Sequence, residues 1–451
     1  MDEKLKPLID RIEAKKDKIL AAERRIWQNP EPGYREWKTH AYLSALYRDL
    51  GYELHEFGNI PGFYFDIETG APGPTLAVFG EMDSLIIASH PECDPETKAV
   101  HACGHHCQSA ALYGVAVALA DPSLLKNLTG RIRLIAVPAE EMIETDFRME
   151  LREKGVIRYF GGKQELIYRG ILDDVDLAMM IHTKTRPGLS VAKGSNGCVV
   201  KRAEFIGKAA HAGGAPYNGH NALYAANLAM NAANALRETF REKDYIRFHP
   251  IITAGGDAVN AIPDRVVVES YVRGASLKAI ERANDRINLA FAAAAAAMHC
   301  DVKFDDEMGY MPRLNEDTLC RVTIEAGRDF FPEEQLAVEA SWGTGCSDMG
   351  DVSTLIPAVH PSIGGASGST HGSDFQVTDP VMATVTSAKV QTGMIYRILK
   401  DGAAVAKKTA ADYQPVFASR EEYIKSMEQF DLRIHGVSYA EDGSVTLKYK
   451  N

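Results

Sequence analysis

The sequence predicts an α/β fold, in which a mainly parallel sheet is flanked by helices and carries an inserted α+β lid domain. Two observations predict it. Short, continuously apolar segments alternate with helical patterns over the first 190 or so residues, which is typical of strands buried on both faces. From about Gly194 the pattern changes to alternating strands and amphipathic helices in the order β-α-β-β-α-β.

The first domain begins with helical periodicity over residues 5–50, which ends at Gly51. Apolar segments at 75–79, 132–137 and 177–181 are predicted as buried strands, and residues 110–120 as a helix of small side chains. Polar residues follow each of these strands. Because ligands collect at the carboxyl ends of strands in such sheets, we expect these polar residues to form one site.

The inserted domain is predicted from strands over 198–207, 245–253, 265–273 and 301–307 and from helices over 221–237 and 277–299. A compact unit of this kind, interrupting a sheet, is expected to form a lid. The expected domains are therefore a catalytic domain built from 1–194 and 310–451, and a lid and dimerisation domain over 195–309.

Composition limits the possible partners. Of the 451 residues, 45% are hydrophobic and 25% are charged, as in globular proteins, and the net charge of −11 argues against nucleic acid or an anionic membrane as a partner. The longest apolar run, 291–298, is far shorter than the roughly 20 residues of a membrane span. Seven scattered cysteines and a charged start without an apolar signal segment predict a cytoplasmic protein.

The densest chemical signal is His101-Ala102-Cys103-Gly104-His105-His106-Cys107. Thiolate and imidazole are the preferred ligands of zinc and related ions, and Cys103 and His105 before a helix can face one ion. A structural zinc knuckle is the alternative. It requires a second paired Cys or Cys/His motif, which the sequence lacks, so we expect a catalytic metal site.

Glu140 and Glu141 directly follow a predicted strand. Two adjacent buried carboxylates repel each other unless a cation is near, so one would bind a metal while the other acts as general base. A solvated loop pair is the alternative. His182 ends the next strand and is a candidate ligand, with a structural hydrogen-bonded role as the alternative. His371 is a second candidate ligand because it lies in a glycine-rich loop, and His360 is the alternative to it.

Three further residues are weaker candidates. Asp83 could orient a metal-binding histidine, or it is simply a turn residue after a strand. Asn260 could donate to substrate oxygens, or shape a turn. Arg273 could pair with a substrate carboxylate, or be a solvated surface residue.

Four motifs occur in an order that resembles the aminoacylase and carboxypeptidase family of metallopeptidases. They are His101-Ala102-Cys103-Gly104-His105, Pro138-Ala139-Glu140-Glu141, Gly207-Lys208-Ala209-Ala210-His211-Ala212 and Asn260-Ala261-Ile262-Pro263-Asp264. The chain is most similar to the N-acyl-amino-acid amidohydrolases, which include hippurate, indoleacetyl-amino acid and aminobenzoyl-glutamate hydrolases. The segment Ser347-Asp348-Met349-Gly350-Asp351-Val352-Ser353, followed by His371, resembles the aminobenzoyl-glutamate type.

The resemblance implies two divalent ions, Zn²⁺ or Mn²⁺, a small N-acyl amino acid as substrate, and Glu140 as the base. The implied metal ligands are Cys103, His105, Glu141, His182 and His371. It also implies a homodimer, paired through the lid, in which His211 reaches the partner's site. The sequence departs from its relatives at His106-Cys107 and at Glu81.

Two other functions stay open. A dipeptidase or carboxypeptidase would accept a free amine on the acyl side of the amide. A non-catalytic metal-binding scaffold is the alternative from another class, and the presence of Glu140 argues against it.

Overall fold

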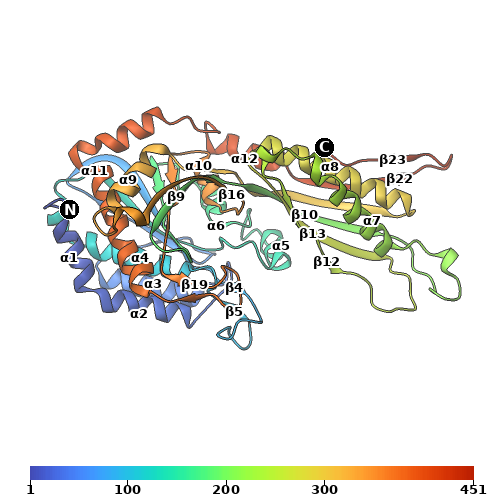
Figure 1. Cartoon of the computed structure of the whole chain (residues 1–451), viewed down its shortest axis with the longest axis horizontal. Helices are drawn as coiled ribbons and strands as arrows, with labels where there is room; N and C mark the ends of the chain where they lie inside the picture. Colours follow the sequence, from blue (N-terminus) through green and yellow to red (C-terminus); the bar gives the residue numbers. More distant parts are fainter. Residues whose placement is uncertain (451) are drawn as a thin grey trace. The chain divides into compact units, whose positions relative to one another are not determined.

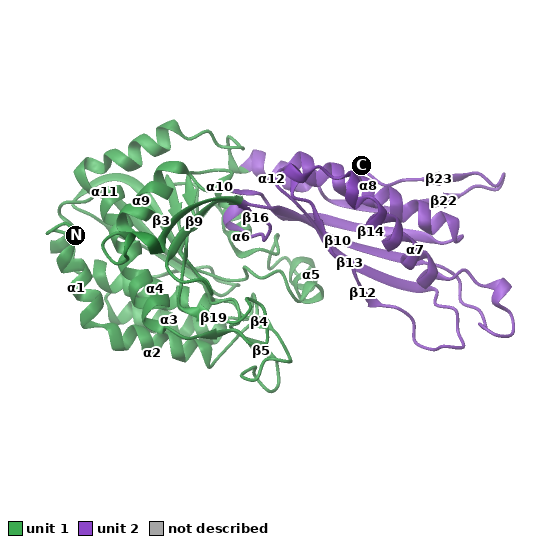
Figure 2. Cartoon of the chain, viewed as in Figure 1, with its two compact units in different colours: residues 1–194, 314–341, 351–420 green, residues 195–313, 342–350, 421–451 purple. Residues whose placement is uncertain are grey.

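The computed structural model describes residues 1–450, which divide into two compact units (Figures 1 and 2). Unit 1 comprises Met1–Gly194, Leu314–Ser341 and Asp351–Arg420, and unit 2 comprises Ser195–Arg313, Trp342–Gly350 and residues 421–450. The sequence pattern assigns all of 310–451 to the first domain. The C-terminal segment instead lies in unit 2, because β21 (Leu432–His435) pairs with β14 (Asp301–Tyr310) at the edge of that unit's sheet.

The main sheet of unit 1 has the strand order β1-β2-β6-β3-β7-β17. The strands β6, β3, β7 and β17 run parallel to one another. At one edge, β2 pairs antiparallel with β6, and β1 pairs antiparallel with β2. This arrangement confirms the predicted α/β class with a largely parallel sheet. The bounds are β1 (His55–Glu56), β2 (Phe63–Glu68), β3 (Ala71–Glu81), β6 (Thr129–Val137), β7 (Leu177–Met179) and β17 (Ala358–Val359).

Helix α4 (His105–Leu119) is the central helix of unit 1, and every residue in it is buried. It packs against β3, against α1 (Lys6–Ala14) and α2 (Lys16–Trp27), and against α11 (Ser387–Asp412). The predicted helical segment 5–50 is three helices, since the backbone leaves helical geometry at Lys15 and again before α3 (Trp37–Asp49).

The remaining elements of unit 1, some of which extend into unit 2, are short or peripheral. The helices are α5 (Thr145–Glu153), α6 (Gly162–Tyr168), α9 (Asp317–Gly327) and α10 (Met349–Ser353). The strands are β4 (Leu85–Ile86), β5 (Ala99–Val100), β8 (His182–Thr183), β9 (Leu189–Ser195), β15 (Arg313–Leu314), β16 (Leu336–Gly343), β18 (Ser362–Ile363), β19 (Ala366–Ser367) and β20 (Gln376–Val377). Boundaries between the two units fall within or beside β9, β15, β16 and α10.

Unit 2 is an antiparallel sheet, in the order β11-β13-β10-β14-β21, with α7 (Ala222–Ala235) and α8 (Leu277–Ala297) packed on it. Its central strands are β10 (Gly197–Ile206) and β13 (Arg265–Gly274), which confirms the predicted β-α-β-β-α-β order. The predicted strand 245–253 is divided into β11 (Arg247–Phe248) and β12 (Ile251–Ala254), since Pro250 between them has no N–H to donate. Helix α12 (Arg420–Glu428) and a hairpin of β22 (Val437–Tyr439) and β23 (Val445–Leu447) complete the chain.

Within residues 1–450, no helix combines the length and the apolar content that crossing a bilayer requires.

Candidate metal centre

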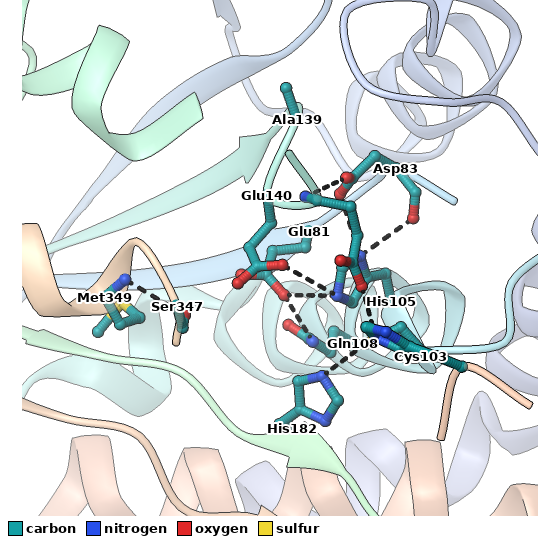
Figure 3. Close-up of polar contacts among 12 residues, drawn as sticks. Glu81, Asp83, Cys103, His105, Gln108, Ala139, Glu140, His182, Ser347 and Met349 are labelled. Atoms are coloured by element: carbon teal, nitrogen blue, oxygen red, sulfur yellow. Dashed lines mark hydrogen bonds and ion pairs between the residues drawn. The ribbon is translucent and has the colours of Figure 1, made fainter. Parts of the chain in front are cut away.

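The polar residues that follow the strands of unit 1 lie together, as Figure 3 shows. Glu81 ends β3, Glu140 and Glu141 follow β6, and His182 begins β8. Cys103 and His105 come from the start of α4. The expectation that strand ends would gather the polar side chains is therefore met in the structure.

A left-handed glycine sets the geometry of the first two candidate ligands. Gly104 has φ 101°, a conformation that L side chains rarely adopt, and a Cβ there would approach the Thr183 side chain to 3.1 Å. The chain therefore turns sharply between Cys103 and His105. Asp83 fixes the imidazole of His105, whose Nδ1 lies 3.0 Å from both Oδ1 and the carbonyl oxygen of Asp83. The other ring nitrogen, Nε2, therefore faces the remaining ligands.

Three groups of donor atoms in unit 1 contain Cys103 or His105, and the atoms of each group lie within 4.8 Å of one another. They are Cys103–His105–His182, Cys103–Glu141–His371 and His105–Glu140–Glu141. Individual separations include 3.3 Å between Cys103 Sγ and His182 Nε2, and 2.9 Å between His371 Nε2 and Glu141 Oε1. The five residues named as ligands from the sequence thus lie in two overlapping groups that share Cys103.

The turn that carries the two glutamates is held from three sides. Ala139 has φ 57°, and its N–H donates to Glu36 Oε1 at 2.8 Å. The N–H of Glu141 donates to Asp83 Oδ2 at 2.7 Å, and the guanidinium of Arg148 donates to the carbonyl of Glu141. Glu140 is buried, and its Oε2 lies 3.9 Å from His105 Nε2. The carboxylate of Glu141 lies 2.9 Å from His371 Nε2, so each of the two adjacent carboxylates has a histidine neighbour.

The surroundings shift the pKa values of these residues in different directions. Burial, reinforced by His105, lowers the pKa of His182 to about 4, so this imidazole is neutral at pH 7. Burial raises the pKa of Asp83, but the charge of His105 and its hydrogen bond outweigh burial and hold it at about 2. Burial also raises the pKa of the Cys103 thiol well above its usual value, so an ion would have to displace its proton.

Sequence reasoning missed a buried ion pair beside the centre. Lys163 Nζ lies 2.5 Å from Glu81 Oε1, and Glu81 Oε2 lies 3.2 Å from His105 Nε2 and accepts from Gln108 at 2.8 Å. Gly162 lets α6 bring Lys163 in, since a Cβ there would lie 1.7 Å from the carbonyl oxygen of Pro138. A lysine in a short helix gives no sequence signal for burial, but the two glycines before it point to close backbone packing.

His360 and His371, the two candidates for the last ligand, have different surroundings. The His360 ring lies 5.8 Å from that of His182, but His360 belongs to none of the donor groups found among residues 1–450. His371 is 49% exposed and has φ 64°, and its N–H donates to the carbonyl of Ala102. The geometry therefore favours His371.

His211, Asn260 and Arg273 belong to unit 2, and their contribution to the metal centre stays a prediction. His211 Nδ1 accepts from the N–H groups of Gly213 and Gly214 at 3.2 and 2.9 Å, so a neutral ring carries its proton on Nε2. The loops of His211 and Asn260 are joined, since Ala212 N–H donates to the Asn260 carbonyl. Arg273 lies over the Tyr271 ring.

Comparison with known proteins gives consistent results. Residues 192–299 match the family model of a peptidase dimerisation domain. The chain is 28% identical over 367 residues to a mouse Xaa-Arg dipeptidase, covering 78% of each protein. It is 25% identical to one of the subunits of the p-aminobenzoyl-glutamate hydrolase of Escherichia coli K12, covering 73% of this chain and 66% of that one.

The fold also matches a solved structure, a dinuclear metal-binding peptidase of the M20 family from Bacillus subtilis. The TM-score is 0.64 at 20% identity, over 86% of this chain and 99% of that one. An N-acetyl-L-cysteine deacetylase and a plant hydrolase of indoleacetyl-amino acids are also among its relatives. Together with the ordered motifs and the clustered donors, these matches support an aminoacylase-type M20 family for the chain and indicate a metal-dependent hydrolase.

Proposed function

We propose that this enzyme uses two divalent ions, Zn²⁺ or Mn²⁺, to hydrolyse the amide that joins an acyl or aroyl group to an amino acid. The observation that carries the proposal is the pair of donor groups that share Cys103, with buried Glu140 beside them. Cys103, His105 and His182 would hold one ion, and Cys103, Glu141 and His371 the other.

The chemistry of the donors fits such ions. Thiolate, imidazole and carboxylate are the ligands of Zn²⁺, and imidazole and carboxylate also suit Mn²⁺. Asp83 supports the set as the carboxylate that orients His105, a contact typical of metal-binding histidines. With one thiolate and one carboxylate, Cys103 and Glu141, the ligands would carry −2 against +4 from the ions. The excess positive charge would favour a substrate with a free carboxylate.

When bound, the ions would lower the pKa of a water molecule and polarise the scissile carbonyl. Glu140 accepts the proton that this water releases as it attacks the amide carbon, and then passes it to the leaving nitrogen. His211 would donate from Nε2 to the oxyanion, since its Nδ1 is already occupied by two backbone N–H groups. Asn260 and Arg273 would bind the polar groups of the amino-acid part.

His211 would act in the partner's site of a homodimer paired through the lid. The match to a peptidase dimerisation domain over 192–299 supports this. So does exposed apolar surface on unit 2: Tyr224 and Leu228 on α7 are 63% and 42% exposed, and Ile251 on the edge strand β12 is 62% exposed. The seven cysteines, an odd number scattered along the chain, support a reducing compartment, the cytoplasm.

A screen of N-acyl and N-aroyl amino acids with Zn²⁺ and Mn²⁺, read by amine release, tests the proposal. The panel includes dipeptides with free amines, because two of the relatives are Xaa-Arg dipeptidases, at 28% and 27% identity, and two are carboxypeptidases. Preference for the blocked substrates supports the amidohydrolase, and preference for free dipeptides supports the peptidase. No turnover by the metal-loaded protein would favour a binding scaffold.

A further inference from the structure

At His106-Cys107, where the sequence differs from its relatives, the two side chains form a buried cluster with a third residue. His106 and Cys107 lie in the first turn of α4, and Glu23 faces them from α2. These three residues, the Glu23 cluster, are all buried: Glu23 is 4% exposed and the other two are 0% exposed. None of them belongs to the donor groups around Cys103.

We propose that the Glu23 cluster binds a further metal ion, a borderline-soft divalent cation such as Zn²⁺, independently of the catalytic ions. One ligand atom from each residue lies within 4.8 Å of the others. His106 Nε2 is 3.2 Å from Glu23 Oε1 and 3.3 Å from Cys107 Sγ. Donors around one tetrahedral zinc ion are separated by about 3.3–3.6 Å, which follows from bonds of about 2.0–2.3 Å.

Charge supports the same assignment. The Glu23 cluster contains one carboxyl group, one imidazole and one thiol, and no lysine or arginine. A divalent ion that displaced the thiol proton would meet −1 from Glu23 and −1 from Cys107. The resulting cluster would be neutral, which is the form that a buried site favours.

The elements around the Glu23 cluster suggest a structural role for the ion, and Trp27 offers a fluorescence signal for its binding. The cluster joins α2 to the turn that carries His105, so a bound ion would hold the start of α4 in place. The Trp27 ring lies edge-on, 5.0 Å from the His106 ring. The competing explanation is a hydrogen bond from His106 Nε2–H to Glu23, with Cys107 as a packing residue.

Metal counting separates the two explanations. The full-length protein is stripped with a chelator, reloaded with Zn²⁺, dialysed and analysed for bound metal. Wild type is expected to retain one more ion per chain than Cys107→Ala. The matched control is Cys320→Ala, which removes a cysteine thiol that is 5% exposed in α9 and should retain the wild-type number. Glu23→Gln replaces Cys107→Ala if that variant does not fold.

A second measurement does not depend on the catalytic ions. In Cys103→Ser loaded with Co²⁺, a thiolate-to-cobalt absorption band with quenching of Trp27 fluorescence is expected, and Cys107→Ala in the same background should abolish the band. The band would persist even if the proposed catalytic site failed to bind metal, so the two proposals fail separately. Equal metal content in wild type and folded Cys107→Ala, or a Cys103→Ser protein without the band, would overturn the Glu23 site.

Discussion

Replacing Asp83 by asparagine should weaken metal binding without changing the shape of the site. Oδ1 of Asp83 faces the His105 ring, and Oδ2 accepts from the N–H of Glu141. Asparagine offers one acceptor oxygen, so its NH₂ group must face one of these two N–H donors. An unsatisfied buried donor costs about 1–3 kcal/mol. Loss of such an orienting contact typically weakens metal affinity by about 10–100-fold, or roughly 1.4–2.7 kcal/mol.

The assay is a competition titration of the apoprotein against a chromophoric chelator of known affinity. Hydrolysis is then measured at limiting and at saturating metal, where much of the lost activity should return. Asp442→Asn is the control, because this exposed aspartate of unit 2 caps a turn by accepting from Ser444 N–H. An Asp83→Asn protein that binds both ions with wild-type affinity would refute the orienting role of Asp83.

Four further results are expected. Glu140→Gln should keep its metal content and lose turnover by about 10²–10⁴-fold, and loss of metal would mean that Glu140 is a ligand. Cys103→Ser should lower metal content and activity together, so full activity at full occupancy would contradict its role. Subunit exchange between inactive His211→Ala and Glu140→Gln should restore part of the activity if His211 acts in trans; no recovery despite proven exchange would contradict that. Asp306→Asn should reduce the free energy of unfolding by about 3–5 kcal/mol in denaturant titrations, because buried Lys201, 2.6 Å away, loses its counter-ion. The double variant Lys201→Met with Asp306→Leu should reduce the free energy of unfolding by less. An equal reduction in both proteins would exclude the ion-pair explanation.

The clustering of the candidate ligands could be predicted from the sequence wherever they directly follow apolar strands. All residues of the strand segment 132–137 except Arg133 are apolar. The position of Glu140 and Glu141 beyond its carboxyl end therefore follows from strand geometry. The same reasoning places His182. The burial of Arg133 could not be predicted from its residue type. Its guanidinium is buried because Asp66 and Asp174 neutralise its charge.

Long-range partners of buried charges could not be predicted. Lys163 is 82 residues from Glu81 in the sequence, and nothing local to either residue identifies the other. The assignment of 421–450 failed for a similar reason, because strand β21 extends a sheet formed more than a hundred residues earlier. Pairing at an open sheet edge depends on which edge is available, and the hydrophobic pattern of one strand does not encode this.

Two left-handed residues connect the ligand loops to the rest of unit 1. Ala139 and His371, with φ 57° and 64°, each adopt a conformation that costs a non-glycine residue on the order of 1–3 kcal/mol. Both are held by their own N–H groups, the first donating to Glu36 and the second to the carbonyl of Ala102, next to Cys103. Burial raises the pKa of Glu36 well above its usual value, and the charge of Asp83 raises it further. Conformational strain and a buried carboxyl group thus both contribute to the placement of the candidate ligands.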